Sequence, residues 1–252
     1  MQNTGNLLLH QYEYGIDQLS YFDVGKGDKT ILLIHGFGED HCIWKSQIEF
    51  LSKKYRVIAP NIPGVQCKPL ALHHSQAPSI RMYVEVLHEL MHHLHIEHYY
   101  IAGHSMGGYI GLSFADYYTN HVQGLLLIHS TTYEDNEAKK ASRMKVAEFI
   151  EEFGVSKYLD TATPNLFSNE FKKNNPAIIQ DVIDSGTEIS KEAMIQFVFA
   201  MRNRKALTHL LQQASIPLWM LAGTEDLAVP IEDSLAQIKQ LPSHQCLSLI
   251  HI

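Results

Sequence analysis

The sequence is poor in several features that mark particular classes of protein. It holds three cysteines in 252 residues, Cys42, Cys67 and Cys246, and they form no C-x-x-C pair. This pattern indicates neither a disulfide framework nor a cysteine zinc site, and it favours a reducing compartment, so we expect a cytoplasmic protein. No apolar run approaches the roughly 18 residues of a membrane span, and the amino terminus has no basic region followed by a long apolar stretch.

Positive charge is also scarce. The chain has 20 lysines and arginines against 27 acidic residues, a formal net charge of −7, and no run of basic residues. Nucleic acids and anionic membranes attract clustered cations, so we expect neither as a partner and instead expect a small-molecule substrate. The sequence also lacks a G-x-x-x-x-G-K-[ST] motif and a G-x-G-x-x-G motif that opens a helix, which argues against nucleotide binding.

Histidine, by contrast, is abundant, with 16 in the chain. His88, His92 and His95 fall on one face of an expected helix, a spacing that is compatible with metal binding. However, there is no H-E-x-x-H motif, and a polar face opposite an apolar stripe is typical of a solvated helix surface. We therefore expect no metal and no cofactor.

The hydrophobic pattern alternates between strand and helix. Short runs rich in β-branched residues and leucine predict strands at 7–14, 18–24, 30–34, 55–59, 98–102, 122–128, 216–222 and 245–252. Helical spacing of apolar residues predicts helices at 44–51, 79–95, 109–118, 137–153, 175–184, 191–213 and 231–240. The first two strands are expected to form an antiparallel edge, and the alternation that follows predicts a mostly parallel α/β sheet flanked by helices.

One segment, residues 130–213, interrupts this alternation. It is rich in Ala, Lys, Glu and Asn, has helical periodicity, and contains no buried strand-like run. We predict that it forms a helical cap inserted after the sixth strand, in a core made of residues 1–129 and 214–252. Pro164 and Pro176 are expected to separate its helices.

The sequence GHSMGG at residues 103–108 follows an expected strand and precedes an expected helix. Its glycines permit a sharp strand-to-helix turn that holds a serine hydroxyl out at the end of the strand. This is the pattern of a nucleophile elbow, so Ser105 is the candidate nucleophile, and a plain tight turn is the alternative. The backbone N–H of Met106 is then a candidate oxyanion donor. His104 is expected to pack and position neighbouring groups rather than to act as the base.

Two further loops follow strands of the predicted sheet. GTEDLAVP at 223–230 carries Asp226, which we expect to orient the catalytic base, with Glu225 as the less favoured acid. An aspartate here also fits a turn or a helix cap. HGFG at 35–38 places the backbone N–H of Phe37 as the second candidate oxyanion donor, and a glycine-rich turn without a catalytic role is the alternative.

These motifs together resemble the α/β-hydrolase-fold serine hydrolases with a helical cap, a family that includes esterases, lactonases and C–C bond hydrolases. The resemblance covers nearly the whole chain and implies an α/β-hydrolase fold with Ser105, Asp226 and the amides of Phe37 and Met106 in the site. A serine in the elbow separates the chain from the related dehalogenases and epoxide hydrolases, which use an aspartate there. The loop NIPGV at 61–65 departs from relatives that often have an acidic residue and a second glycine.

The expected function is hydrolysis of an ester or related acyl bond through an acyl-enzyme on Ser105, with the cap shaping an apolar pocket. The alternative is a non-hydrolytic protein on the same scaffold, which would be a lyase-like enzyme, a cofactor-free oxygenase or a ligand-binding receptor.

The catalytic histidine is the part that this pattern does not supply. In the family it follows the last strand, whereas this sequence is strand-like to its final residue, so we expect a chain truncated before that histidine and poorly active. His251 is the alternative base if the strand ends early, and His244 is the other histidine after Asp226. Loss of a triad member lowers the rate by several orders of magnitude.

Overall fold

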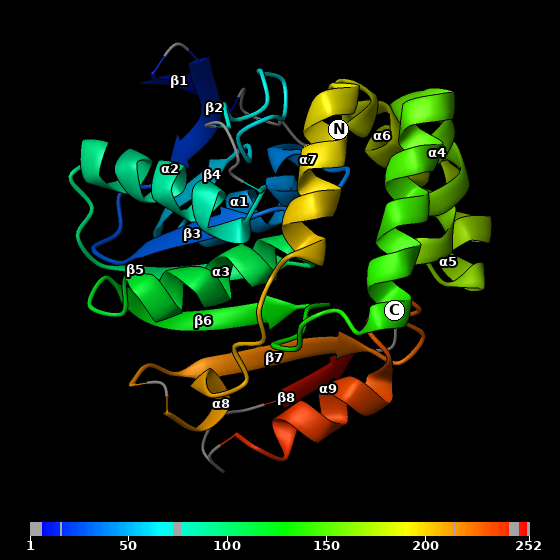
Figure 1. Cartoon of the computed structure of the whole chain (residues 1–252). Helices are drawn as coiled ribbons and strands as arrows, with labels where there is room; N and C mark the ends of the chain where they lie inside the picture. The colour runs from blue at the N-terminus through cyan, green and yellow to red at the C-terminus, as the bar shows by residue number, and fades with distance from the viewer. Residues whose placement is uncertain (1–6, 16, 73–76, 214, 242–246, 251–252) are drawn as a thin grey trace.

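A single twisted sheet organises the molecule. The computed structural model describes residues 7–15, 17–72, 77–213, 215–241 and 247–250. Within these residues eight strands run in the order β1-β2-β4-β3-β5-β6-β7-β8 (Figure 1). The strands are β1 (Leu9–Tyr14), β2 (Asp17–Val24), β3 (Thr30–Ile34), β4 (Arg56–Pro60), β5 (Tyr99–His104), β6 (Val122–Ile128), β7 (Leu218–Gly223) and β8 (Leu247–Ile250).

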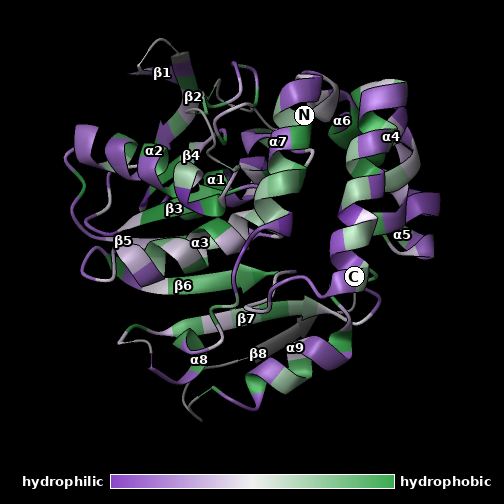
Figure 2. Ribbon diagram, viewed as in Figure 1, coloured by the Kyte–Doolittle hydropathy of each residue, from purple (hydrophilic) through white to green (hydrophobic). Residues whose placement is uncertain are grey.

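The pairing of the strands follows the prediction. β1 and β2 form the antiparallel edge, β2 joins β4 antiparallel, and every pair from β4 to β8 is parallel. Parallel strands with both faces covered are continuously apolar, and Leu32, Leu33 and Ile34 of β3 are almost fully buried. The strands are accordingly among the most hydrophobic parts of the ribbon (Figure 2). The predicted α/β-hydrolase architecture, a mostly parallel sheet flanked by helices, is confirmed.

Helices cover the two faces of the sheet separately. On one face, α1 (Lys45–Leu51) packs against β3 and β4. Ile48 within α1 and Trp44 directly before it are buried in a cluster with residues of these two strands. On the other face, α2 (Ile80–His93), α3 (Met106–Tyr117) and α9 (Ile231–Ile238) share the larger core (Figure 1). Ser79 stands at the N-cap of α2 as predicted, although its side chain makes no capping hydrogen bond.

The described chain between β6 and β7 contains helices joined by irregular stretches and no strand. It forms α4 (Glu137–Ala162), a 3₁₀ turn (Thr163–Leu166), α5 (Asn169–Asn174), α6 (Pro176–Thr187), α7 (Lys191–Arg202) and α8 (Leu210–Gln213). Helices α4 to α7 gather beside the carboxyl ends of the strands, whereas α8 lies apart from them (Figure 1). None of the helices in the described residues is long and apolar enough to cross a membrane.

Three details of this helical segment differ from the prediction, the first being α5, which was not predicted. The helix expected at 137–153 continues to Ala162 across a break at Gly154, whose φ of 83° and ψ of 170° are non-helical. Only glycine adopts such a conformation readily, so the helix changes direction there. The helix expected at 191–213 ends at Arg202, and the short α8 follows after an irregular stretch.

Candidate active site

Ser105 lies on a sharp turn between β5 and α3, at the carboxyl end of the sheet. Its φ of 50° and ψ of −112° are strained for a residue with a side chain. The flanking glycines are required by space, because a Cβ on Gly103 would collide with the backbone of Gly107, and one on Gly107 would collide with the Ile34 carbonyl. The strand, turn and helix expected around GHSMGG are therefore present, with the serine exposed toward a cavity.

Asp226 follows β7, the second strand beyond β5 in the sheet. One carboxylate oxygen, Oδ1, accepts the backbone N–H groups of Ala228 and Val229 at 2.8 and 2.9 Å. The other, Oδ2, lies 2.7 Å from Nδ1 of His129. Burial tends to raise the pKa of Asp226, but these three donors outweigh it and hold the pKa below its ordinary value. Asp226 thus closes a turn, as the alternative interpretation held, and also holds an imidazole.

His129 is a site residue that the sequence did not reveal. It follows β6 directly, with a positive φ of 48°, and lines the same cavity as Ser105. The parallel pairs His104–Ile128 and Ile128–Leu221 place the residues after β5, β6 and β7 next to one another. The available signal was a histidine immediately after the strand that neighbours the elbow strand, but only the sheet order shows that it reaches Asp226.

Glu39 and His104 form a second carboxylate–imidazole pair beside Ser105. Oε2 of Glu39, a side chain that is largely buried, lies 2.9 Å from Nδ1 of His104 and accepts the Gly36 N–H at 2.6 Å. Burial tends to raise the pKa of Glu39, but His104 and the Gly36 N–H bring it below its ordinary value. For His104, burial opposes protonation, and the Glu39 carboxylate more than compensates and raises the pKa. His104 is thus a packed residue with an acidic partner that the sequence did not identify.

The loop that carries Phe37 is held from several directions. His35 is fully buried, and burial lowers its pKa, so the ring is neutral. Its Nε2 accepts the Ile62 N–H at 2.9 Å, which leaves Nδ1–H to donate to the Gly36 carbonyl at 2.9 Å. The Gly36 carbonyl and the Phe37 N–H belong to one peptide plane, so this hydrogen bond orients the candidate oxyanion donor.

The same loop touches the helical segment directly. A Cβ on Gly38, whose φ is 75°, would lie 2.8 Å from Cδ2 of Leu159 in α4. A Cβ on Gly186 in α6 would collide with the Gly38 carbonyl oxygen. The Phe37 ring also packs edge-on against Tyr158, with ring centroids 5.8 Å apart. Helices α4 and α6 therefore form one wall against the loop.

A cavity of about 310 Å³ joins these groups. Its polar lining includes Ser105, His104, His129, Glu39, Glu225 and Asp226, and its apolar lining includes Phe37, Ile128, Leu166, Phe167, Val182 and Leu221. The strand ends supply the reactive groups, whereas the helical segment supplies apolar contacts. Such a combination of a few convergent polar groups in an apolar pocket is typical of a small-molecule site.

Two other cavities among the described residues lie away from Ser105. One, of about 310 Å³, lies beside α2 and α3 and includes Tyr109 and Arg204, which is already engaged with the ring of Tyr109 at 4.0 Å. The other, of about 440 Å³, lies against the sheet on the α1 face and is lined by apolar residues such as Leu33, Leu126 and Trp219. Neither contains a nucleophile with an acid–imidazole partner.

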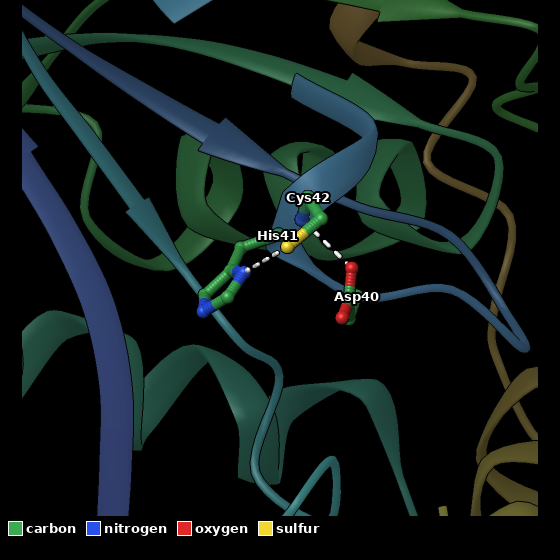
Figure 3. Close-up of side chains that lie close together, drawn as sticks. All are labelled: Asp40, His41 and Cys42. Carbon is green, nitrogen blue, oxygen red and sulfur yellow. Dashed lines mark hydrogen bonds between the residues drawn. The ribbon is translucent and has the colours of Figure 1, made fainter. Parts of the chain in front are cut away.

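A group with metal-ligand chemistry lies at the start of the 3₁₀ turn His41–Trp44. The ligand atoms of Asp40, His41 and Cys42 lie within 4.8 Å of one another (Figure 3). However, Asp40 Oδ1 accepts the Cys42 N–H at 2.7 Å and caps the turn, and His41 Nδ1 lies 3.4 Å from Cys42 Sγ. These local hydrogen bonds, which include the cap of the turn, explain why the three side chains lie together. In the part of the chain that the structure describes, the predicted helix-face histidines do not form a metal-ligand group.

Three of the predicted site residues, Ser105, Phe37 and Asp226, line one cavity, and Met106 is buried beside it at the start of α3. The two histidines after Asp226, His244 and His251, lie outside the described residues. The structure adds Glu39 and His129 to the predicted set. Each is adjacent to a residue or motif that the sequence did single out.

The chain matches the family model of the alpha/beta hydrolase fold over residues 29–165. It is similar in structure to a thermophilic esterase from Thermogutta terrifontis, with a TM-score of 0.84, 26% identity, and coverage of 97% of this chain and 89% of that one. The enol-lactonase from Burkholderia xenovorans LB400 has a TM-score of 0.82 at 19% identity, with coverage of 96% and 91%. The Karrikin insensitive 2 receptor IA of Petunia hybrida is 23% identical over 220 aligned residues, which cover 82% of this chain and 77% of the receptor.

Proposed function

Because the chain belongs to the α/β-hydrolase fold family, we propose that it hydrolyses an ester or related acyl bond of a small molecule through an acyl-enzyme on Ser105. The observation that carries this proposal is the strained serine at the end of β5, which opens into the cavity where Asp226 binds an imidazole. A serine hydroxyl is a weak nucleophile until a neighbouring base accepts its proton, and a carboxylate orients that base.

In the proposed reaction, Ser105 Oγ attacks the acyl carbon while its proton passes to an imidazole held by Asp226. Among the described residues that imidazole belongs to His129. The backbone N–H groups of Phe37 and Met106 donate to the oxyanion, and the imidazolium returns its proton to the leaving alcohol as the C–O bond breaks. Water then repeats the sequence on the acyl-enzyme, which releases the acid and the free serine.

The apolar part of the cavity supports a non-polar acyl group as the preferred substrate. Leu166, Phe167 and Val182 come from the helical segment, so we assign residues 130–213 as a cap that selects the substrate and residues 1–129 and 214–252 as the catalytic core. The acidic groups on the opposite wall, Glu225 and Asp226, disfavour a second carboxylate on the substrate near the scissile bond.

The first test is labelling with a fluorophosphonate, which reacts covalently with an activated serine. We expect the wild-type chain to be labelled at Ser105, and Ser105→Ala to lose both the label and the turnover of a short-chain aryl ester, by about a thousandfold or more. Ser168→Ala is the matched control, because Ser168 lines the same cavity but its hydroxyl caps α5. Labelling that persists in Ser105→Ala would refute the assignment.

A second function, ligand binding without turnover, is favoured by the similarity to the Petunia receptor. Fold does not fix function, and the same pocket serves either purpose. Turnover separates the two proposals. A protein that only binds its ligand would bind an aryl ester without releasing phenol in multiple cycles. Multiple turnovers that depend on Ser105 would favour the hydrolase.

A further inference from the structure

The Glu39 carboxylate bridges two loops that approach each other only in the folded chain. One is the loop after β3, through the Gly36 N–H, and the other is the elbow after β5, through the His104 imidazole. Both donors reach the same oxygen, Oε2, at 2.6 and 2.9 Å. An ionised carboxylate that accepts hydrogen bonds from a backbone N–H and from an imidazole makes charge-assisted hydrogen bonds, which are shorter and stronger than neutral ones.

There is no spare room around this bridge. A Cβ on Gly36 would lie 2.9 Å from Glu39 Oε2, 3.1 Å from His104 Nδ1 and 3.2 Å from Ser105 Cβ. There is therefore no room for a side chain between the Gly36 backbone, the Ser105 side chain and the two members of the pair. A displacement of Glu39 has to be accommodated by the Gly36 backbone or by the elbow.

The two hydrogen bonds of Gly36 determine where the next amide points. Glu39 fixes the Gly36 N–H, and His35 Nδ1–H fixes the Gly36 carbonyl, which shares its peptide plane with the Phe37 N–H. The donors of an oxyanion hole act only if they are held in place before the reaction, since reorienting them during the reaction removes their advantage. The His35 hydrogen bond fixes the orientation of the peptide plane between Gly36 and Phe37. The Glu39 hydrogen bond fixes the position of Gly36 relative to Ser105.

We propose that Glu39 is a positioning residue for the oxyanion donor, which ties the Phe37 amide to the nucleophile elbow through His104. This inference rests on the proposed hydrolase function, in which the Phe37 N–H stabilises the transition state. Glu39 touches neither substrate nor scissile bond in this role. Its replacement destabilises the transition state more than the bound substrate, because negative charge on the carbonyl oxygen is absent from the substrate and develops as the nucleophile attacks.

The test compares Glu39→Ala and Glu39→Gln with the wild-type chain. We expect Glu39→Ala to lower kcat by about 10- to 100-fold with KM changed less than about threefold, as for a misplaced donor. The second-order rate of fluorophosphonate labelling at Ser105 should fall by a similar factor, since the phosphonyl oxygen enters the same hole. Glu39→Gln retains an acceptor for the Gly36 N–H but loses the charge that pairs with His104, so we expect a smaller, several-fold loss of kcat.

The control is Asp23→Asn, which removes another part-buried carboxylate that pairs with Arg56 away from the cavity. It should leave kcat, KM and the labelling rate unchanged. If Glu39→Ala does not fold, Glu39→Gln decides the question, with a kcat loss of several-fold at constant KM expected. A wild-type kcat in either folded variant, or a change in KM alone, would overturn the role of Glu39. Failure of the wild-type chain to be labelled at Ser105 would instead overturn the proposed function.

Discussion

Replacing Asp135 by asparagine should destabilise the protein, because Asp135 neutralises the buried Arg204 and the partly buried Arg143. Asp135 is 1% exposed and precedes α4, where it pairs with Nε of Arg143 at 3.0 Å and with an Nη of Arg204 at 2.8 Å. The Arg204 side chain is 6% exposed, and its other nitrogens already donate to the carbonyls of Met201 and Tyr133. The guanidinium is thus fixed in place and cannot turn toward water when the carboxylate is removed.

The magnitude follows from this arrangement. Removing one partner of a buried ion pair typically lowers the free energy of unfolding by about 3–5 kcal/mol. Asparagine retains a neutral acceptor, and Arg143 has some access to water, so we expect a value near the lower limit, about 3 kcal/mol. For a chain of this size, that corresponds to a fall in Tm of about 6–12 °C.

The assay is urea and thermal unfolding of Asp135→Asn beside Asp160→Asn, which removes an exposed carboxylate on α4. The control should stay within about 0.5 kcal/mol of the wild-type chain. A cycle with Arg204→Met should show a coupling energy above about 1 kcal/mol, as for residues in one network. A stability for Asp135→Asn equal to that of Asp160→Asn would show that the two arginines are solvated without it, and the reasoning would be refuted.

Two further outcomes follow from the acid–imidazole pairs. We expect His129→Ala to lower fluorophosphonate labelling and ester turnover about a thousandfold while His251→Ala has no effect, and the opposite result would assign the base to His251. The pKa of His104 is raised in the folded protein, so its pair with Glu39 contributes fully to stability at pH values below the ordinary histidine pKa. This contribution is lost as the pH rises through the pKa that His104 has in the folded protein. Urea unfolding at pH 6 and pH 9 should therefore show an alkaline loss of stability in the wild-type chain that is absent in Glu39→Gln, and equal pH dependence in the two proteins would contradict the pairing.

Where the signal is local, the sequence predicts the position of a candidate site residue in the fold. The elbow at 103–108 is specified by glycines that the turn itself requires, and the run at 122–128 predicts β6 to the residue. Asp226 is accessible to prediction for the same reason, because a short loop after a strand holds it. These features depend on neighbours within a few positions, so a single sequence contains enough information to place them.

The two residues that were missed depend on distant contacts. Glu39 lies 65 positions from His104, and His129 lies 97 positions from Asp226. Each pair forms only because β3, β5, β6 and β7 are consecutive in the sheet, an order that hydrophobic patterning does not specify. The continuation of α4 to Ala162 was also missed, because the predicted helix ends at Phe153, directly before the non-helical Gly154.

The close contact between Gly186 and the Gly38 carbonyl links two properties of the protein that are often treated as separate. Helix α6 contributes Val182 to the apolar lining of the cavity, and one turn further along its backbone abuts the loop of the proposed oxyanion donor. Replacing this helix to change the acyl preference therefore also changes the position of the loop that carries the proposed oxyanion donor, and with it the reaction rate. Engineered chimaeras should keep a glycine at position 186, and substrate range and turnover in this protein are expected to diverge together during evolution rather than independently.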